Sequence, residues 1–106
     1  MPSYAYFYQQ FVPLAEAKIE VMTHALHYGT AIFEGIRGNW NDEHQQIYLF
    51  RLKEHYHRMR NGCQVMRISL PHTIDELCQI TIELVRRCGF QEDIYIRPLA
   101  YKNAQA

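Results

Sequence analysis

The sequence predicts an α+β fold, in which a mostly antiparallel sheet packs against two helices. Three observations lead to this prediction: extended segments rich in aromatic and β-branched residues come first, two segments with helical periodicity follow, and an alternating strand comes last. Strands and helices that are grouped rather than alternating are typical of the α+β class. The 106 residues, 48% of them hydrophobic, suffice for one core and are too few for two domains.

The first part of the chain is predicted to be mainly extended. Residues 4–14 are aromatic and β-branched, and Pro13, which cannot donate to a strand ladder, favours a strand or hairpin close to a sheet edge. Residues 18–22 continue this extended character. Residues 23–29 then carry a candidate helix cap, Thr23, and a final glycine, which together suit one helical turn.

A strand, a polar loop and a second strand are expected next, because β-branched and aromatic residues flank a polar stretch. These elements correspond to residues 30–40, 41–46 and 47–50. From there the apolar residues recur at helical spacing, and Asn61-Gly62 is expected to end that helix. Its apolar stripe consists of Leu52, Tyr56, Met59 and Cys63.

The second helix has the strongest signals in the sequence. Thr73 and Glu76 form a capping box after a proline, and Gly89 is expected to end the helix. The alternating residues 94–101 then form a strand, in which Pro98 indicates a sheet edge or a bulge. The apolar face of the helix consists of Ile74, Leu77, Cys78, Thr81, Leu84, Val85 and Cys88.

The composition excludes several classes of protein. Eleven basic and eleven acidic residues balance and are interleaved, so the basic stripe of a nucleic-acid-binding protein is missing. No stretch approaches the ~18 apolar residues that span a bilayer, and the first residues lack the pattern of a signal peptide. Three cysteines without a CxxC pair argue against a disulfide framework. We therefore expect a cytoplasmic protein without nucleic-acid or membrane partners.

Two histidine pairs raise the question of a metal site. His24 and His27 are three residues apart and His55 and His57 two apart, as in some metal sites. No carboxylates or cysteines complete a recognisable ligand spacing around either pair, so no metal site is expected. His24 and His27 are better explained as hydrogen-bonded structural groups. The three cysteines are expected to be packed free thiols. The glycines match neither GxxxxGKS/T nor GxGxxG.

Three segments carry a resemblance to a known family: residues 24–38 (HALHYGTAIFEGIRG), 50–59 (FRLKEHYHRM) and 95–99 (YIRPL). In order and spacing they resemble the branched-chain amino-acid aminotransferases, which are class IV (fold-type IV) enzymes dependent on pyridoxal 5'-phosphate (PLP). The similarity runs from about residue 11 to residue 99. It implies that residues 1–106 are the N-terminal small domain of such an enzyme, and that the domain bearing the cofactor lysine is absent from this chain.

The resemblance assigns one cofactor ligand. Arg58 matches the arginine that binds the PLP phosphate in this family, and a guanidinium fixed on a helix can meet a phosphate dianion with charge-assisted hydrogen bonds. Without the resemblance, a solvated surface arginine would be the ordinary interpretation of Arg58.

The substrate pocket of this family must accept an apolar branched side chain and, in the second half-reaction, the acid groups of glutamate. An apolar wall with a few fixed polar groups meets that need. Tyr95 and Arg97 alternate on one strand, so their side chains should project to the same face. Core packing is the alternative interpretation of Tyr28 and Phe33. By resemblance, Phe33 and Gly35 line the wall, Tyr28 reaches it from the neighbouring subunit, Tyr95 holds the α-carboxylate, and Arg37 and Arg97 recognise acid groups.

Transamination needs a lysine that forms a Schiff base with PLP and moves a proton. Lys18, Lys53 and Lys102 do not match the family's position for it, so we expect no catalytic residue in this chain and an isolated chain that is inert. Residues 101–106 follow the last predicted strand without a helix cap or a tail, so we expect the sequence to end near the connection between two domains. An apolar face toward the other domain would favour self-association.

The expected function is therefore the transfer of the amino group of L-leucine, L-isoleucine or L-valine to 2-oxoglutarate through PLP, in a homo-oligomer. Two alternatives stay open. The first is another class IV enzyme, a D-amino-acid aminotransferase or an aminodeoxychorismate lyase, although these typically lack FEGIR followed by YIRPL. The second is a non-catalytic oligomerisation domain.

Overall fold

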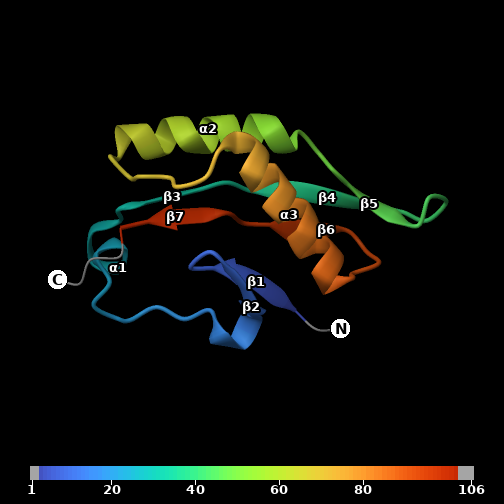
Figure 1. Cartoon of the computed structure of the whole chain (residues 1–106), viewed down its shortest axis with the longest axis horizontal. Coiled ribbons are helices and arrows are strands. Elements are labelled where there is room, and N and C mark those ends of the chain that lie inside the picture. The colour runs from blue at the N-terminus through green and yellow to red at the C-terminus, as the bar shows by residue number, and fades with distance from the viewer. Residues whose placement is uncertain (1–2, 103–106) are drawn as a thin grey trace.

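The computed structural model describes residues 3–102 as two long helices packed on antiparallel strands (Figure 1). Helix α2 lies along one side of the strands, α3 crosses them, and the hairpin of β1 and β2 lies beside α3. All strand pairs are antiparallel, which confirms the predicted α+β class. The elements in chain order are β1 (Tyr4–Phe7), β2 (Gln10–Pro13), a 3-10 turn (Leu14–Glu16), α1 (His24–Tyr28), β3 (Ala31–Phe33), β4 (Ile36–Asn41), β5 (Gln46–Leu49), α2 (Leu52–Val65), α3 (Ile74–Cys88), β6 (Ile94–Ile96) and β7 (Leu99–Tyr101).

Strands β3, β4, β6 and β7 form one antiparallel ribbon that is interrupted in the middle. β3 pairs with β7 and β4 with β6, and the same register holds on both sides because two residues separate the paired segments on each strand. One backbone hydrogen bond crosses the interruption, from the Glu34 amide to the Pro98 carbonyl at 3.1 Å. The interruption therefore changes the pairing without shifting any side chain to the other face.

This interruption corrects the prediction of continuous strands over residues 30–40 and 94–101. Pro98 has no amide hydrogen, so it cannot complete the ladder at its position. The alternative of a bulge is wrong, because neither strand gains a residue. The hairpin over residues 4–14 is confirmed, whereas residues 18–22, expected to be extended, join no strand.

Helix α2 continues past its predicted end at Asn61-Gly62 and stops at Val65. A glycine inside a helix costs about 1 kcal/mol relative to alanine. Gly62 lies against β3, where a Cβ would be 3.1 Å from Cγ2 of Ile32, and Cys63 is only 1% exposed. Close packing of this last turn on the ribbon outweighs the weak helix propensity.

Apart from the late end of α2 and the cap of α1, the helix ends follow the sequence signals. The Glu76 amide donates to the Thr73 hydroxyl at 3.1 Å and the Thr73 amide to the Glu76 carboxylate at 2.8 Å, which confirms the capping box. Gly89 and Gly29 end α3 and α1 in the left-handed conformation, as predicted. Thr23 occupies the predicted N-cap position of α1, but its side chain is buried and makes no capping hydrogen bond.

The core lies where α2 and α3 meet the ribbon. The Thr81 hydroxyl donates to the Leu77 carbonyl at 2.8 Å, which leaves its oxygen to accept from the Tyr56 hydroxyl. Burial raises the pKa of Tyr56 above its ordinary value of 10.0. The buried apolar side chains are Ile36, Tyr56, Met59, Cys63 and Ile74.

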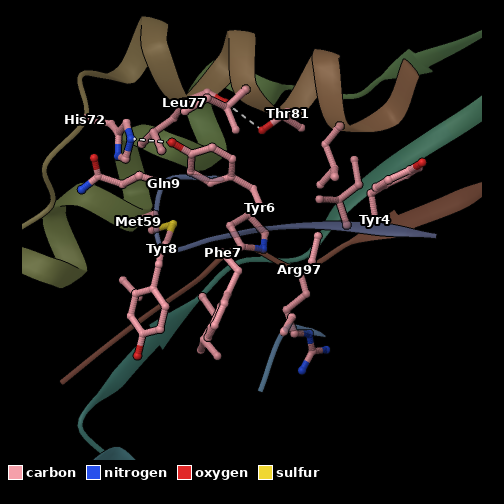
Figure 2. Close-up of a pocket in the computed structure, with 18 of the residues that line it drawn as sticks. Tyr4, Tyr6, Phe7, Tyr8, Gln9, Met59, His72, Leu77, Thr81 and Arg97 are labelled. Atoms are coloured by element: carbon pink, nitrogen blue, oxygen red, sulfur yellow. Dashed lines mark hydrogen bonds between the residues drawn. The ribbon is translucent and has the colours of Figure 1, made fainter. Parts of the chain in front are cut away.

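A cavity of about 960 Å³ is lined by the β1–β2 hairpin, α3, β6 and β7 (Figure 2). Tyr6 reaches across from the hairpin to His72, with 3.1 Å between its hydroxyl and Nε2. Of the predicted apolar face of α3, only Ile74 and Thr81 are buried, and Leu84 and Val85 are half-buried along the cavity.

Candidate active site

One face of the interrupted ribbon carries exposed side chains, and most residues predicted for substrate binding lie on it. Side chains alternate along each strand, so one face presents Ile36 and Glu34 to the helices, while Tyr95 and Arg97 on the other are exposed and line the cavity beside the hairpin. The predicted shared orientation of Tyr95 and Arg97 is confirmed, and both are exposed. The predicted residues on the exposed face are Phe33, Gly35, Arg37, Tyr95 and Arg97.

Arg97 lies against two aromatic rings of this face. Its guanidinium carbon is 4.6 Å from the ring centroid of Phe33 and 5.6 Å from that of Tyr95, which are cation–π distances. Phe33 is 55% exposed, so core packing, the alternative interpretation of this residue, is wrong for this chain. Within residues 3–102 neither Arg97 nor Arg37 has an acidic partner, so both can meet the acid group of a ligand.

Gly35 lies directly beneath the Tyr95 ring. A Cβ at residue 35 would lie 2.6 Å from Cζ of Tyr95 and would collide with the hydroxyl oxygen. Any larger residue would therefore displace the ring. The glycine lets a tyrosine lie over the backbone at the interruption.

Arg58 reaches the same interruption from α2, on the helix side. Its Nε donates to Oε2 of Glu34 at 2.9 Å and its Nη2 donates to Oε1 at 2.8 Å, in a bidentate pair. His55, one turn earlier on α2, places Nδ1 2.8 Å from the same Oε1. An ionised carboxylate only accepts hydrogen bonds, so we assign the donated hydrogen to Nδ1.

Burial and pairing set the charge states of this cluster. The Glu34 side chain is 7% exposed, whereas that of Arg58 is 73% exposed. The hydrogen bonds from Arg58, and secondarily that from His55, hold the pKa of Glu34 below its ordinary 4.5 despite its burial. The same hydrogen bonds with Glu34 raise the pKa of Arg58 above its ordinary value. Glu34 and Arg58 are therefore both ionised at neutral pH.

Arg58 retains donors for a further anion. An arginine has five N–H groups, and Glu34 engages the one on Nε and one on Nη2, which leaves both on Nη1 and the second on Nη2. A hollow of about 240 Å³ adjoins this group, lined by Arg51, Glu54, His55 and Arg58. Phosphate oxygens are acceptors, so this exposed donor set fits a phosphate.

Tyr28 lies apart from the other predicted residues. It is the last residue of α1, is 63% exposed, and packs on His24 with 4.4 Å between ring centroids. Core packing is therefore wrong for Tyr28 as well. No hydrogen bond or ring contact joins it to the exposed face in the described part of this chain. His24 and His27 bond to the Thr30 hydroxyl and the Val21 carbonyl, both at 2.8 Å, which confirms them as hydrogen-bonded groups.

Metal-binding and disulfide sites are absent from residues 3–102. No group of three or more histidine, cysteine or acidic side chains gathers there as a metal ion would need. The three cysteines are free thiols. No helix in the same range has the length and apolar character to cross a membrane.

Glu34 and His55 belong to the cluster, although neither the sequence pattern nor the family resemblance assigns them a role. One signal was available for Glu34, because it lies among inward-facing apolar positions of a predicted strand. A carboxylate in such a position must be paired, since burying it alone is costly. The partners themselves are far away in sequence, on a helix whose rotation relative to the strand could not be derived from periodicity.

Fold and site together define a class of protein. The sequence profile of the family described as amino-transferase class IV matches residues 31–106, and the chain belongs to this family. Among solved structures it is similar to the branched-chain aminotransferase of Thermoproteus uzoniensis with norvaline, with a TM-score of 0.92 and 37% identity over 100% of this chain and 35% of that one. The branched-chain amino acid aminotransferase of Thermobaculum terrenum in its PLP form gives a TM-score of 0.86 and 40% identity, covering 94% and 33%.

The curated relatives point to the same branch of the family. The probable branched-chain-amino-acid aminotransferase of Aquifex aeolicus (strain VF5) is 47% identical over 98 residues, which is 92% of this chain and 32% of the relative. The branched-chain-amino-acid aminotransferase of Escherichia coli (strain K12) is 38% identical over 98 residues, covering 92% and 31%. The chain thus spans about a third of the length of these relatives.

Proposed function

We propose that the chain acts as the small domain of a branched-chain amino-acid aminotransferase, which transfers the amino group of L-leucine, L-isoleucine or L-valine to 2-oxoglutarate with PLP. One observation carries the proposal. The adjacent residues Glu34 and Gly35 join Arg58, an exposed arginine with further donors, to a face with aromatic side chains and two guanidiniums that have no acidic partner within residues 3–102. The names of the relatives, and the PLP form of one of the solved structures, support the same reaction.

Arg58 and the residues of the exposed face each have a task in this proposal. Arg58 binds the phosphate of PLP, and the cofactor, when bound, supplies the electron sink of the reaction. Phe33 and Gly35 form the apolar wall for the branched side chain, and Tyr95 holds the α-carboxylate. Arg37 and Arg97 recognise acid groups by charge-assisted hydrogen bonds. Tyr28, which is remote from these residues within one chain, serves the site of a neighbouring subunit.

The cofactor lysine is proposed to come from a further domain. Lys53 is held 3.8 Å from Asp75 at the surface, and Lys18 is exposed before α1, so neither lies at the site. Lys102 follows β7 and donates its amide to the Thr30 carbonyl at 3.0 Å. The partners in this proposal are that domain, amino-acid and 2-oxo-acid substrates, and further copies in a homo-oligomer. Three free thiols suit a reducing cytoplasm.

The test uses the natural polypeptide that contains residues 1–106, whatever its length. PLP is added, borohydride traps any cofactor bonded to an amine, and the intact mass is measured. A species with one pyridoxyl group supports the proposal. A polypeptide that takes up no pyridoxyl group contradicts it, and a stable complex without PLP absorbance would favour the oligomerisation domain.

A substrate panel then decides between class IV reactions. L-leucine, L-isoleucine and L-valine should each drive consumption of 2-oxoglutarate. Activity with D-alanine or with aminodeoxychorismate alone would replace the branched-chain assignment by one of the other class IV activities.

A further inference from the structure

We propose that Glu34 is a positioning residue, which fixes the guanidinium of Arg58 so that its Nη1 edge is presented to the phosphate of PLP. The inference rests on the proposed function, because it concerns the same cofactor. It gives a role to a buried carboxylate for which the resemblance supplied none.

The geometry of the pair carries the first step. Glu34 engages Nε and one hydrogen of Nη2, at 2.9 and 2.8 Å, and a bidentate pair of this kind aligns the guanidinium with the carboxylate plane. The Nη1 edge is then the one remote from Glu34. The Arg58 side chain is 73% exposed, so packing leaves it largely unrestrained and the carboxylate is its main restraint.

Glu34 itself is firmly held, which makes it suitable as an anchor. Its amide donates to the Pro98 carbonyl across the interruption at 3.1 Å, and Oε1 also accepts from His55 at 2.8 Å. The carboxylate is buried, and a buried carboxylate without partners is costly, so it does not leave this position to follow the arginine.

The position of the anchor links two parts of the site. Gly35, next in the chain, contacts the Tyr95 ring on the opposite face. Because Glu34 binds Arg58 and is joined to Gly35 by one peptide bond, the position of Arg58 is fixed relative to the substrate-facing side of the ribbon. A phosphate bound at Nη1 is held at a fixed position with respect to Tyr95.

The charge of Glu34 works against phosphate binding, and the test must separate this effect from positioning. Removing the charge would relieve repulsion of a phosphate dianion while also releasing the arginine. Glu34→Asp keeps the charge and shortens the side chain by one methylene, so that it no longer meets both Nε and Nη2. This variant isolates positioning.

The experiment measures the affinity of the natural polypeptide, freed of cofactor, for PLP and for pyridoxal, which lacks the phosphate. We expect Glu34→Asp to weaken PLP binding about tenfold or more, because a free arginine side chain loses substantial rotamer freedom on binding, and to leave pyridoxal binding within about twofold. Glu83→Asp is the matched control, since Glu83 pairs with Arg87 at 3.0 Å on the surface of α3. A ratio of PLP to pyridoxal affinity that stays within about threefold of the parent's overturns the inference.

A second measurement needs no variant and covers the case in which Glu34→Asp does not fold. In protein labelled with 15N-arginine, the Nε–H of Arg58 should exchange slowly with solvent both before and after PLP is added, while its Nη signals move. The Nε–H of Arg60, an exposed arginine on the same helix, serves as reference. Equal exchange rates for the two Nε–H groups overturn the inference.

The two proposals fail separately. A parent polypeptide that takes up no PLP contradicts the proposed function. A parent that binds PLP, with Glu34→Asp keeping its preference for PLP over pyridoxal, contradicts only the role of Glu34.

Discussion

Gly35 lies beneath the ring of Tyr95, which pairs with Arg37 on the neighbouring strand, and the missing side chain at residue 35 is what allows the tyrosine ring to lie there. A Cβ would come within 2.6 Å of Cζ of Tyr95. The preceding residue, Glu34, binds Arg58 on the other face. A group suited to phosphate and a face suited to carboxylates are thus connected through one peptide bond.

Gly35→Ala should displace Tyr95 and impair substrate binding more than stability. The ring is exposed, so it can rotate away without opening the core. We expect KM for L-leucine to rise about tenfold, the cost of one or two lost contacts, with kcat changing less. Steady-state kinetics of the natural polypeptide measure this.

Gly62→Ala is the matched control for that substitution. Its Cβ would lie 3.1 Å from Ile32 at the helix–strand contact, away from the exposed face. Its KM should match that of the parent. If KM for L-leucine in Gly35→Ala equals that of the parent, substrate binding does not depend on the present position of Tyr95.

Arg97→Lys should weaken recognition of acid groups although it keeps the charge. A lysine cannot lie flat on both Phe33 and Tyr95, and it loses the planar fork that matches a carboxylate. We expect KM for 2-oxoglutarate to rise by about tenfold. Arg86→Lys, at the exposed end of α3, should leave it unchanged. If KM for 2-oxoglutarate is the same in Arg97→Lys as in the parent, Arg97 does not recognise the acid groups of the substrate.

Local signals in the sequence were sufficient to predict the helices and strands, but not the extension of α2 or the break in the ribbon. The capping box of Thr73 and Glu76 and the glycine ends of α1 and α3 depend on neighbouring residues alone, and they were predicted correctly. The extension of α2 through Gly62 depends on how closely β3 approaches, and the interruption at Pro98 depends on which strand lies opposite. Both features depend on tertiary contacts, which cannot be derived from the periodicity of the sequence.

The site was predictable only in part, for the same reason. Alternation placed Tyr95 and Arg97 on one face, and the family resemblance supplied Arg58. The pairing of Arg58 with Glu34 joins residues 24 positions apart, on a helix and a strand whose mutual orientation follows from packing. No spacing rule within one element could have produced it.

Ile36→Ala should destabilise the fold strongly. Ile36 is 0% exposed and packs between α2 and the ribbon, so the substitution leaves a cavity that the neighbours only partly fill. We expect a loss of about 2–5 kcal/mol in the free energy of unfolding, measured by urea denaturation. Ile36→Val should lose about 0.5–1.5 kcal/mol. Equal stability of Ile36→Ala and the parent would contradict the position of the core.

Thr73→Ala should weaken α3 at its first turn. It removes the acceptor of the Glu76 amide and leaves that donor without its partner. The expected loss is about 1 kcal/mol in the free energy of unfolding. Thr73→Ser keeps the hydroxyl and should stay close to the parent. Identical melting temperatures for the alanine and serine variants would mean that the capping box contributes nothing.

Glu34 should make stability depend on pH in the acid range. Its pKa is lowered in the folded chain, chiefly by the hydrogen bonds from Arg58, so the folded state favours the ionised carboxylate more than the unfolded state does. A lowered folded pKa contributes stability that is complete above the ordinary value of 4.5 and is lost as the pH falls below it toward the folded value.

Glu34→Gln removes this contribution and therefore reveals it. The parent should exceed the variant in free energy of unfolding above pH ~5, and the difference should shrink as the pH falls below ~4.5, measured by urea denaturation across this range. The capping-box bonds from Thr73 lower the pKa of Glu76 as well, but Glu76 is present in both proteins and cancels in the difference. The groups that face Glu34 are Arg58 and His55, so the series is repeated in a His55→Asn background, where the decrease should persist. A difference that stays constant down to pH ~3 would mean that the Glu34 carboxylate has the same pKa in the folded and unfolded chain.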